Sequence, residues 1–291
     1  MEISKNVIFP DFKLDRQTVP GLVALNVGNL NEMSDFYQKV IGLTLLKKSQ
    51  ETVTLGAGSR PLVKLIQVNH PLPRSRKTGL YHTAFLLPSR KELGSALYHY
   101  VTTKAPVTGG ADHGYSEAIY LTDPEDNGIE VYHDKPREEW DIRADGEIVG
   151  VTEELAAQEV IDLADRNWHG FPEGTVLGHV HLKVSDLDKT EQFYTDSLGL
   201  SLKNNFGKQA KFFATGDYHH HIGANSWESQ QAPAIKENDL GLAYFTFYVK
   251  NEAEFSRLEK HWQEKKIDYQ KEKGLWLRDP NGIKIGFEQI N

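Results

Sequence analysis

The chain has 291 residues, of which 39% are hydrophobic and 25% are charged, the composition of an ordinary globular protein long enough for two domains. Its 33 basic and 41 acidic residues give a formal charge of -8 without any block of like charge, which argues against a nucleic-acid-binding surface because phosphate binding needs a clustered basic field. There are no cysteines, so disulfides and thiolate ligands are excluded and any metal must be held by nitrogen and oxygen atoms.

Residues 1–20 are predicted to form an N-terminal tail. Acidic and basic residues are mixed in this segment, and it lacks the apolar core of a secretion signal. A run of about 18 apolar residues, the length that would suggest a membrane span, does not occur in the sequence. We therefore expect a cytoplasmic protein without a membrane anchor.

An internal repeat begins directly after the tail. Residues 22–45 align without a gap on residues 179–202, and the Asp-Pro turn at 123–124, with its following Asn-Gly-Ile, recurs at 279–283. These two repeats predict four related modules, at residues 21–70, 79–133, 177–227 and 240–289. We expect the first two to form one domain, 21–133, and the last two a second domain, 177–291. Residues 134–176 would form a connector with a helix near 153–166.

Each module opens on an alternating run that predicts a half-buried strand. In the third module, Val180, Leu182 and Val184 share one face of this strand, whereas His179, His181 and Lys183 share the other. A helix is expected over residues 186–198, with Asp186 as its N-cap and Gly199 as its stop. The Phe-Tyr pairs at 36–37 and 193–194 lie at equivalent positions of two such helices and are predicted to pack on the sheet.

Glycine-punctuated strands complete a β-α-β-β-β order in each module. One face of the sheet should pack on the helix, and the other should curve around a cup. The predicted fold class is therefore α+β, with four βαβββ modules paired into two curved-sheet cups. This arrangement resembles the vicinal oxygen chelate superfamily, which includes glyoxalase I, fosfomycin and bleomycin resistance proteins and extradiol dioxygenases. The resemblance covers nearly the whole chain apart from the tail and the connector.

In that superfamily, metal ligands lie on the first strand of a module and near the end of its last strand. These positions hold His82 and Glu130 in the second module and His179 in the third. Two imidazoles and a carboxylate form the facial triad of non-haem Fe(II) oxygenases, which leaves positions open for substrate and dioxygen. The resemblance thus implies Fe(II), and Mn(II) suits the same donors. The equivalent residues of modules one and four, which cannot hold a divalent cation, are Leu22, Tyr244 and Lys284. A single metal site is therefore expected, in a cup shared by modules two and three.

The segment from His113 to Glu130 resembles the signature of extradiol dioxygenases. That signature is a histidine, an apolar-tyrosine pair, an Asp-Pro turn and a ligand glutamate, and here the pair ends in Tyr120. The sequence departs from it at Ala111. It departs again at Asp126, a position where glycine or proline is usual. The resemblance implies that Tyr120 and His113 hydrogen-bond and orient the substrate oxygen.

Residues 217–222 resemble a His-His pair of the same enzymes, in which the second histidine is the acid/base. That residue aligns with His220, and we expect His219 and His221 to be supporting groups because alternate strand residues face opposite sides. The overall resemblance is closest to the two-domain bacterial catechol 2,3-dioxygenase type. A water-excluding wall is predicted from four aromatic residues, Tyr115, Phe206, Phe213 and Trp227.

The resemblance implies an extradiol dioxygenase that cleaves catechol or a substituted catechol with O2 to a muconic semialdehyde. Two alternatives stay open. A glyoxalase-type metal-dependent lyase or isomerase would have four protein ligands, usually with a second glutamate. A non-catalytic small-molecule-binding or resistance protein would lack bound metal. The sequence is also compatible with a homo-oligomer and does not specify the catechol.

Overall fold

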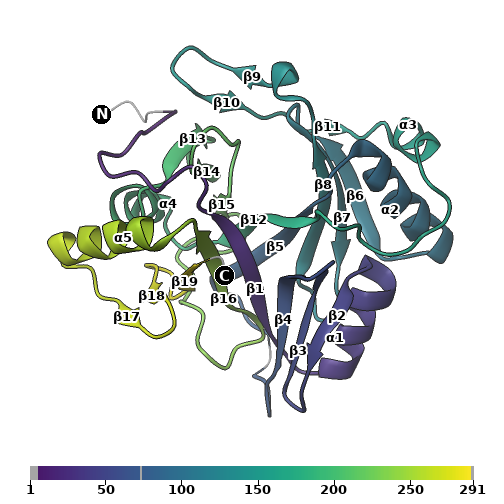
Figure 1. Cartoon of the computed structure of the whole chain (residues 1–291), viewed down its shortest axis with the longest axis horizontal. Helices are drawn as coiled ribbons and strands as arrows, with labels where there is room; N and C mark the ends of the chain where they lie inside the picture. Colours follow the sequence, from purple (N-terminus) through teal and green to yellow (C-terminus); the bar gives the residue numbers. More distant parts are fainter. Residues whose placement is uncertain (1–5, 73, 290–291) are drawn as a thin grey trace.

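The computed structural model describes residues 6–72 and 74–289, and most of its regular structure consists of strands gathered in two large twisted sheets (Figure 1). Helices lie on the outside of these sheets. In the view of Figure 1, residues 19–134 lie toward one side and residues 176–289 toward the other, and the segment before residue 19 runs along the second side. The α+β class with two curved sheets is confirmed.

Each predicted module shows the β-α-β-β-β order. The first consists of β1 (Val19–Val27), α1 (Leu30–Phe36) with its π-helical continuation η1 (Tyr37–Ile41), β2 (Thr44–Lys48), β3 (Thr52–Ala57) and β4 (Arg60–Gln67). The second consists of β5 (Gly79–Leu86), α2 (Arg90–Thr103), β6 (Val107–Asp112), β7 (Ser116–Thr122) and β8 (Gly128–Asp134).

The second half repeats this order. The third module consists of β12 (Val176–Lys183), α4 (Leu187–Gln192) with the π-helical η3 (Phe193–Ser197), β13 (Ser201–Asn205), β14 (Ala210–Ala214) and β15 (Ile222–Asn225). The fourth consists of β16 (Gly241–Val249), α5 (Glu252–Lys265), β17 (Gln270–Lys271), β18 (Leu275–Arg278) and β19 (Lys284–Gln289).

The helix that follows the first strand of each module begins at a side-chain cap. A side-chain oxygen accepts a hydrogen bond from a backbone N–H two or three residues later, which satisfies one of the free donors of the first turn. The capping residues are Asn29, Ser89, Asp186 and Asn251. Gly199 ends the third-module helix with a φ of 80°, a left-handed conformation that glycine adopts without steric cost. The predicted cap and stop of this helix are therefore confirmed.

The two sheets are built across the halves of the chain. β1 pairs antiparallel with β16, so that modules one and four share the sheet β17-β18-β19-β16-β1-β4-β3-β2. β5 pairs antiparallel with β12, so that modules two and three share the sheet β11-β6-β7-β8-β5-β12-β15-β14-β13. We call these the outer-module sheet and the inner-module sheet. The division into domains 21–133 and 177–291 stays a prediction.

A continuous apolar core lies between the sheets and their helices. It contains Val180, Leu182 and Val184, as the alternation of β12 predicts. Tyr37 and Tyr194, the tyrosines of the repeated Phe-Tyr pairs, are completely buried in the same core. Full burial of one large apolar side chain contributes roughly 1.5–3 kcal/mol, so these positions anchor each helix to its sheet.

The connector differs from its prediction. The helix expected over 153–166 is reduced to α3 (Ala157–Asp162), because the preceding β11 (Glu153–Glu154) pairs with β6 at the edge of the inner-module sheet. Ala156, at the N-cap position of α3, offers no side-chain acceptor. The rest of the connector includes a short hairpin of β9 (Asp141–Ile142) and β10 (Ile148–Val149), and the 3-10 turn η2 (Arg137–Glu139). Among the described residues, none of the helices has the length and apolar character to span a bilayer.

Candidate metal centre

Three adjacent strands at the middle of the inner-module sheet carry the predicted ligand residues. Ala84 of β5 lies opposite His179 of β12 on one side and opposite Glu130 of β8 on the other. His82 precedes Ala84 by two residues on β5 and therefore faces the same side of the sheet. Because Ala84 contributes only a methyl group, it leaves room for the three longer side chains to converge.

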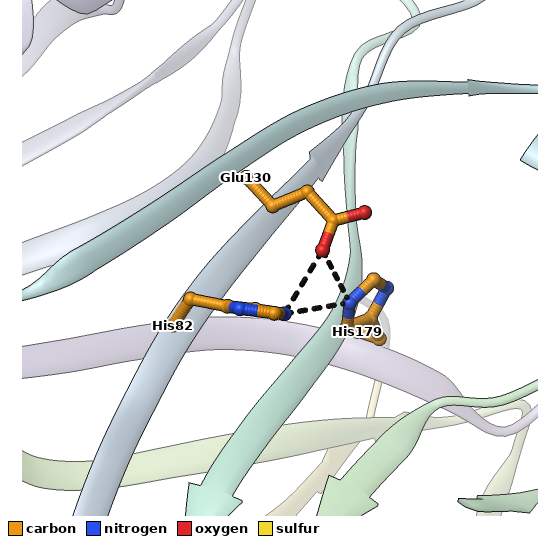
Figure 2. Close-up of side chains that lie close together, drawn as sticks. All are labelled: His82, Glu130 and His179. Atoms are coloured by element: carbon orange, nitrogen blue, oxygen red, sulfur yellow. Dashed lines mark hydrogen bonds and ion pairs between the residues drawn. The ribbon is translucent and has the colours of Figure 1, made fainter. Parts of the chain in front are cut away.

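The three side chains point toward one another (Figure 2). His82 Nε2 lies 2.9 Å from Glu130 Oε2 and 3.1 Å from His179 Nε2, and the third distance, from His179 Nε2 to Glu130 Oε2, is 3.2 Å. For metal–ligand bonds of about 2.1 Å at right angles, neighbouring ligand atoms lie about 3.0 Å apart. The nearly equilateral triangle of donor atoms thus has the dimensions of one face of a metal octahedron.

The charges of this cluster also suit a cation. The exposed fractions are 6% for His82, 3% for Glu130 and 2% for His179. Burial by itself raises the pKa of Glu130, but the two imidazoles outweigh it and hold this pKa well below its usual range. Burial lowers the pKa of His179 to about 4, so this ring is neutral at neutral pH. A buried carboxylate beside a neutral imidazole lone pair needs a positive charge between them.

His179 has a further feature that fits a metal ligand. Its second ring nitrogen, Nδ1, is buried and has no hydrogen-bond partner among the described residues. The polar contacts of this ring are therefore those of Nε2 within the triad. The residues present fit Fe(II) or another divalent ion that prefers nitrogen and oxygen ligands. Their role as ligands stays a prediction.

Tyr120 and His113 lie together beside the triad, as predicted. Tyr120 of β7 is opposite Glu130 of β8, and its hydroxyl lies 2.6 Å from His113 Nε2. His113 Nδ1 lies 2.8 Å from the Val151 carbonyl, which can only accept, so Nδ1 carries the proton of the neutral ring. His113 Nε2 therefore accepts the Tyr120 proton, and the phenol oxygen keeps its lone pairs for another partner. Burial, followed by the charge of Glu130, raises the pKa of Tyr120 well above its usual value.

The histidines at 219–221 precede β15, so strand alternation does not govern them, and His219 and His220 stay together while His221 points elsewhere. The ring of His220 lies against His179, with 4.1 Å between their centroids. His221 turns away, and its Nδ1 accepts a hydrogen bond from the Thr215 backbone at 3.2 Å. Burial, followed by the charges of His179 and His219, lowers the pKa of His220 well below its usual value.

A chain of hydrogen bonds orients His220. Its Nδ1 lies 2.7 Å from Nδ1 of His219, and Nε2 of His219 lies 2.9 Å from Asp134 Oδ1. The carboxylate accepts the Nε2 proton, so the neutral His219 ring presents a lone pair at Nδ1 and accepts from His220 Nδ1. The remaining nitrogen of His220, Nε2, then carries a lone pair and can accept a proton. Asp134 has no place in the sequence prediction, although it lies four residues after Glu130 on the same strand face.

A cavity of about 660 Å³ contains the triad together with His113, Tyr120 and His220. Tyr115, Phe206 and Trp227 line it, as expected for its aromatic wall. The prediction for Phe213 is wrong, because this residue is completely buried in the core on the other face of β14, and its neighbour Phe212 lines the cavity instead. Tyr81, His181 and Lys183 also line the cavity, although they received no role from the sequence. The alternation of β12, which places His181 and Lys183 on the face of His179, was the available signal for two of them.

Asp126 explains one departure from the signature. Its φ is 60°, in the left-handed region where glycine is favoured and where aspartate is among the better-tolerated alternatives. The turn is closed by hydrogen bonds between the Asp123 N–H and the Asn127 carbonyl and between the Asp126 N–H and the Asp123 carbonyl, each 3.0 Å long. The substitution thus preserves the turn that presents Glu130.

Comparisons with known proteins agree with this geometry. A family model described as the glyoxalase/bleomycin resistance protein/dioxygenase superfamily matches residues 20–131 and 176–287. The chain is similar to a protein of Bacillus subtilis (strain 168) named catechol-2,3-dioxygenase, with 39% identity over 239 residues, 80% of this chain and 84% of that protein.

Solved structures with much lower identity share the fold. Glyoxalase I from Zea mays superposes with a TM-score of 0.56 and 15% identity, over 93% of this chain and 92% of that one. The cppA protein from Streptococcus pneumoniae TIGR4 gives a TM-score of 0.53 and 15% identity, over 98% of this chain and 100% of that one.

Proposed function

Because the chain belongs to the glyoxalase/bleomycin resistance protein/dioxygenase superfamily, we propose that it is an Fe(II)-dependent extradiol dioxygenase that cleaves a catechol ring with O2. The observation that carries this proposal is the buried triangle of His82, Glu130 and His179 in one cavity with Tyr120, His113 and His220. These three side chains would hold the metal and would leave coordination positions for the two reactants.

The metal and the protein contribute different chemistry. Fe(II), when bound, supplies Lewis acidity and a template on which both reactants meet, and Mn(II) suits the same donors. The protein residues bind, orient and exchange protons with the substrate. The expected product is the ring-opened semialdehyde.

His220 is the residue placed to accept a proton from a catechol hydroxyl. The hydrogen-bond chain through His219 to Asp134 leaves the Nε2 lone pair of His220 without another proton. A positioned imidazole of this kind can take up a proton and return it later in the same reaction. His219 and Asp134 act through His220 and are positioning residues.

Tyr120 is placed to hold the other polar edge of the substrate. The Tyr120 hydroxyl donates a hydrogen bond to His113, so its oxygen is available to accept a hydrogen bond from a catechol hydroxyl. His113 is in turn held by the Val151 carbonyl, so the pair is fixed before substrate binds.

The two alternatives predict different sites. A glyoxalase-type lyase or isomerase would add a fourth protein ligand, but within the described residues the cluster consists of two histidines and one glutamate. A non-catalytic binding protein would have no need for a buried carboxylate between two imidazoles, which is costly without a cation. The identity with the Bacillus subtilis protein also favours ring cleavage.

The decisive experiment is anaerobic reconstitution with Fe(II), followed by measurement of oxygen uptake and of the yellow ring-fission product. Catechol and a panel of substituted catechols should each be tested, with the zinc-loaded protein as the control for redox-inactive metal. We expect oxygen and product in equal amounts. An iron-loaded protein that neither consumes oxygen nor forms product across the panel would refute the proposal. Isomerisation of a glutathione hemithioacetal, measured in parallel, would support the glyoxalase alternative instead.

A further inference from the structure

Lys183 lines the same cavity as the triad, further along the strand that carries His179. It follows His179 and His181 on the cavity face of β12, four residues beyond the predicted ligand. At about 3.3 Å per residue, the backbone positions of His179 and Lys183 are about 13 Å apart, which is more than the width of a single aromatic ring. A substituent on a ring bound at the triad is the part of a substrate that would extend toward Lys183.

The ammonium group of Lys183 lacks a fixed partner. The side chain is half-buried, and no hydrogen bond or ion pair joins its Nζ to another of the described residues. Glu228 is close enough to influence it, but this carboxylate is exposed to solvent. A partly desolvated, unpaired cation at the end of a substrate cavity favours a ligand with negative charge.

A second cavity adjoins the first at Lys183, and further basic residues line it. It has a volume of about 430 Å³ and shares Leu80, Lys183 and Glu228 with the cavity of the triad. The guanidinium of Arg74 donates to the amide oxygen of Asn127, and that of Arg76 donates to backbone carbonyls, so neither charge is neutralised by these contacts. The lining also holds Lys77, which pairs with Asp239, and the exposed Glu228, so basic side chains outnumber acidic ones there in a chain with a formal charge of -8.

Aromatic side chains also line the cavity between the triad and Lys183. The ring of Tyr81 contacts those of His82, His181 and Trp227, with centroids 5.4, 5.1 and 5.1 Å away. Nε2 of His181 is buried and has no hydrogen-bond partner in the described part of the chain. The path from the triad to Lys183 thus offers flat apolar surface, one free imidazole nitrogen and a terminal cation.

We propose that the substrate is a catechol with an anionic side chain and that Lys183 is the specificity-determining residue that binds its carboxylate. This inference rests on the proposed dioxygenase function. The catechol hydroxyls would lie at the triad, the ring and side chain would lie along Tyr81 and His181, and the carboxylate would pair with Lys183. Arg74 and Arg76 would draw the anion toward this end of the cavity.

The test compares 3,4-dihydroxyphenylacetate with its neutral methyl ester, which differs mainly in charge. We expect the wild-type protein to prefer the acid in kcat/KM by on the order of 10-fold, chiefly through KM. Lys183→Met should remove this preference, and Lys183→Arg should keep most of it. Added salt should weaken the preference in the wild type. Lys284→Met, which removes a cation from the outer-module sheet, is the matched control and should leave the acid-to-ester ratio unchanged.

Equilibrium binding separates this inference from the function on which it rests. Calorimetric titration of the metal-loaded protein without O2 should show tighter binding of the acid than of the ester, and Lys183→Met should abolish the difference. Equal binding of acid and ester by the wild type, or an unchanged preference in Lys183→Met, would overturn the inference even if the ring is cleaved. Absence of ring cleavage with a Lys183-dependent binding preference would refute the dioxygenase proposal and leave the anion site supported.

Discussion

The inner-module and outer-module sheets share a framework but differ in the side chains at equivalent positions. His179, His82 and Glu130 of the first correspond in the repeat to Leu22, Tyr244 and Lys284 of the second. The strand registers extend the comparison, because Val180 lies opposite Ile222 as its repeat partner Val23 lies opposite Val63. This register places Pro61 where the inner-module sheet has His220.

At the place of the triad, the outer-module sheet has a lysine packed on an aromatic ring. Lys284 Nζ lies 4.8 Å from the centre of the Trp276 ring, which packs edge-on against Tyr244 at 5.3 Å. Gly286 makes this arrangement possible, because a Cβ there would lie 2.6 Å from the Trp276 ring. A cation–π contact thus occupies the region that corresponds to the triad. The comparison teaches that this scaffold carries no chemistry by itself and that the reaction depends on a few side chains placed on it.

The largest effect should come from the ligand positions. Glu130→Ala removes the only carboxylate of the predicted triad, so we expect loss of bound metal and a fall in activity of more than about 1,000-fold, since even groups that merely support ligands contribute 10- to 100-fold. Lys284→Ala, the equivalent change in the outer-module sheet, should keep the wild-type metal content. Elemental analysis and oxygen uptake would check both. Stoichiometric metal in Glu130→Ala would contradict the assignment of the site.

The second-largest effect is expected at His220, and it tests whether the two sheets differ in more than their metal-ligand positions. His220→Gln should lower kcat by on the order of 100-fold while metal content stays at the wild-type level, because a proton acceptor is lost but the triad remains. Asp134→Asn should lower kcat by a smaller factor, since the amide keeps an oxygen acceptor for His219. If His220→Gln also released the metal, His220 would have to be regarded as a support for His179.

A third prediction concerns the buried Asp-Pro turn of the outer-module sheet. Burial raises the pKa of Asp279 from 3.8 to about 6. Folding therefore favours the protonated carboxyl, so its contribution to stability is complete below pH 3.8 and is lost as the pH rises through 6. Asp279→Asn cannot ionise, so its free energy of unfolding relative to wild type should rise by up to about 3 kcal/mol across this window. Urea unfolding at several pH values would test this, with the exposed Asp35→Asn as the control, and a relative stability that does not change with pH would contradict it.

The smallest expected effect is the loss of stability when the hydroxyl of either repeated tyrosine is removed. The Tyr37 hydroxyl donates to Asp123 Oδ2 at 3.0 Å, whereas the buried Tyr194 hydroxyl faces Asp279 without a hydrogen bond of good geometry within the described residues. Tyr37→Phe should therefore destabilise the protein by about 1–2 kcal/mol, and Tyr194→Phe by clearly less. Urea unfolding of the two variants would measure both, and equal losses would show that the two hydroxyls are equivalent.

The sequence predicted the fold from local periodicity and the internal repeat, and it predicted the triad from the ligand positions of the superfamily that this repeat resembles. Alternation placed His179 on the cavity face of β12, and the repeat of the Asp-Pro turn distinguished Glu130 from Lys284. The repeat by itself does not determine which modules pair, because any two first strands with apolar faces could meet. The assignment of the cup to modules two and three depended on where the ligands lay.

Other features could not be predicted from the sequence, because they depend on strand register or on tertiary contacts. Phe212 and Phe213 are consecutive aromatic residues on one strand, so a shift of one residue exchanges the cavity and core faces, and the prediction chose the wrong one. The chain from His220 to Asp134 joins residues 86 positions apart, which no local pattern reports. The connector helix was overestimated because the pairing of Glu153 with Asp112 is a tertiary contact.

The crossed pairing of strands has a consequence for the order in which the protein can be assembled. On the ribosome, every strand of the inner-module sheet, from β5 to β15, is synthesised before β16 begins. All strands that carry the candidate metal centre are thus synthesised while β1 still exposes an unpaired edge. An open strand edge of this kind is prone to associate with other chains, so the interval before β16 emerges is the stage at which newly made protein is most exposed to aggregation.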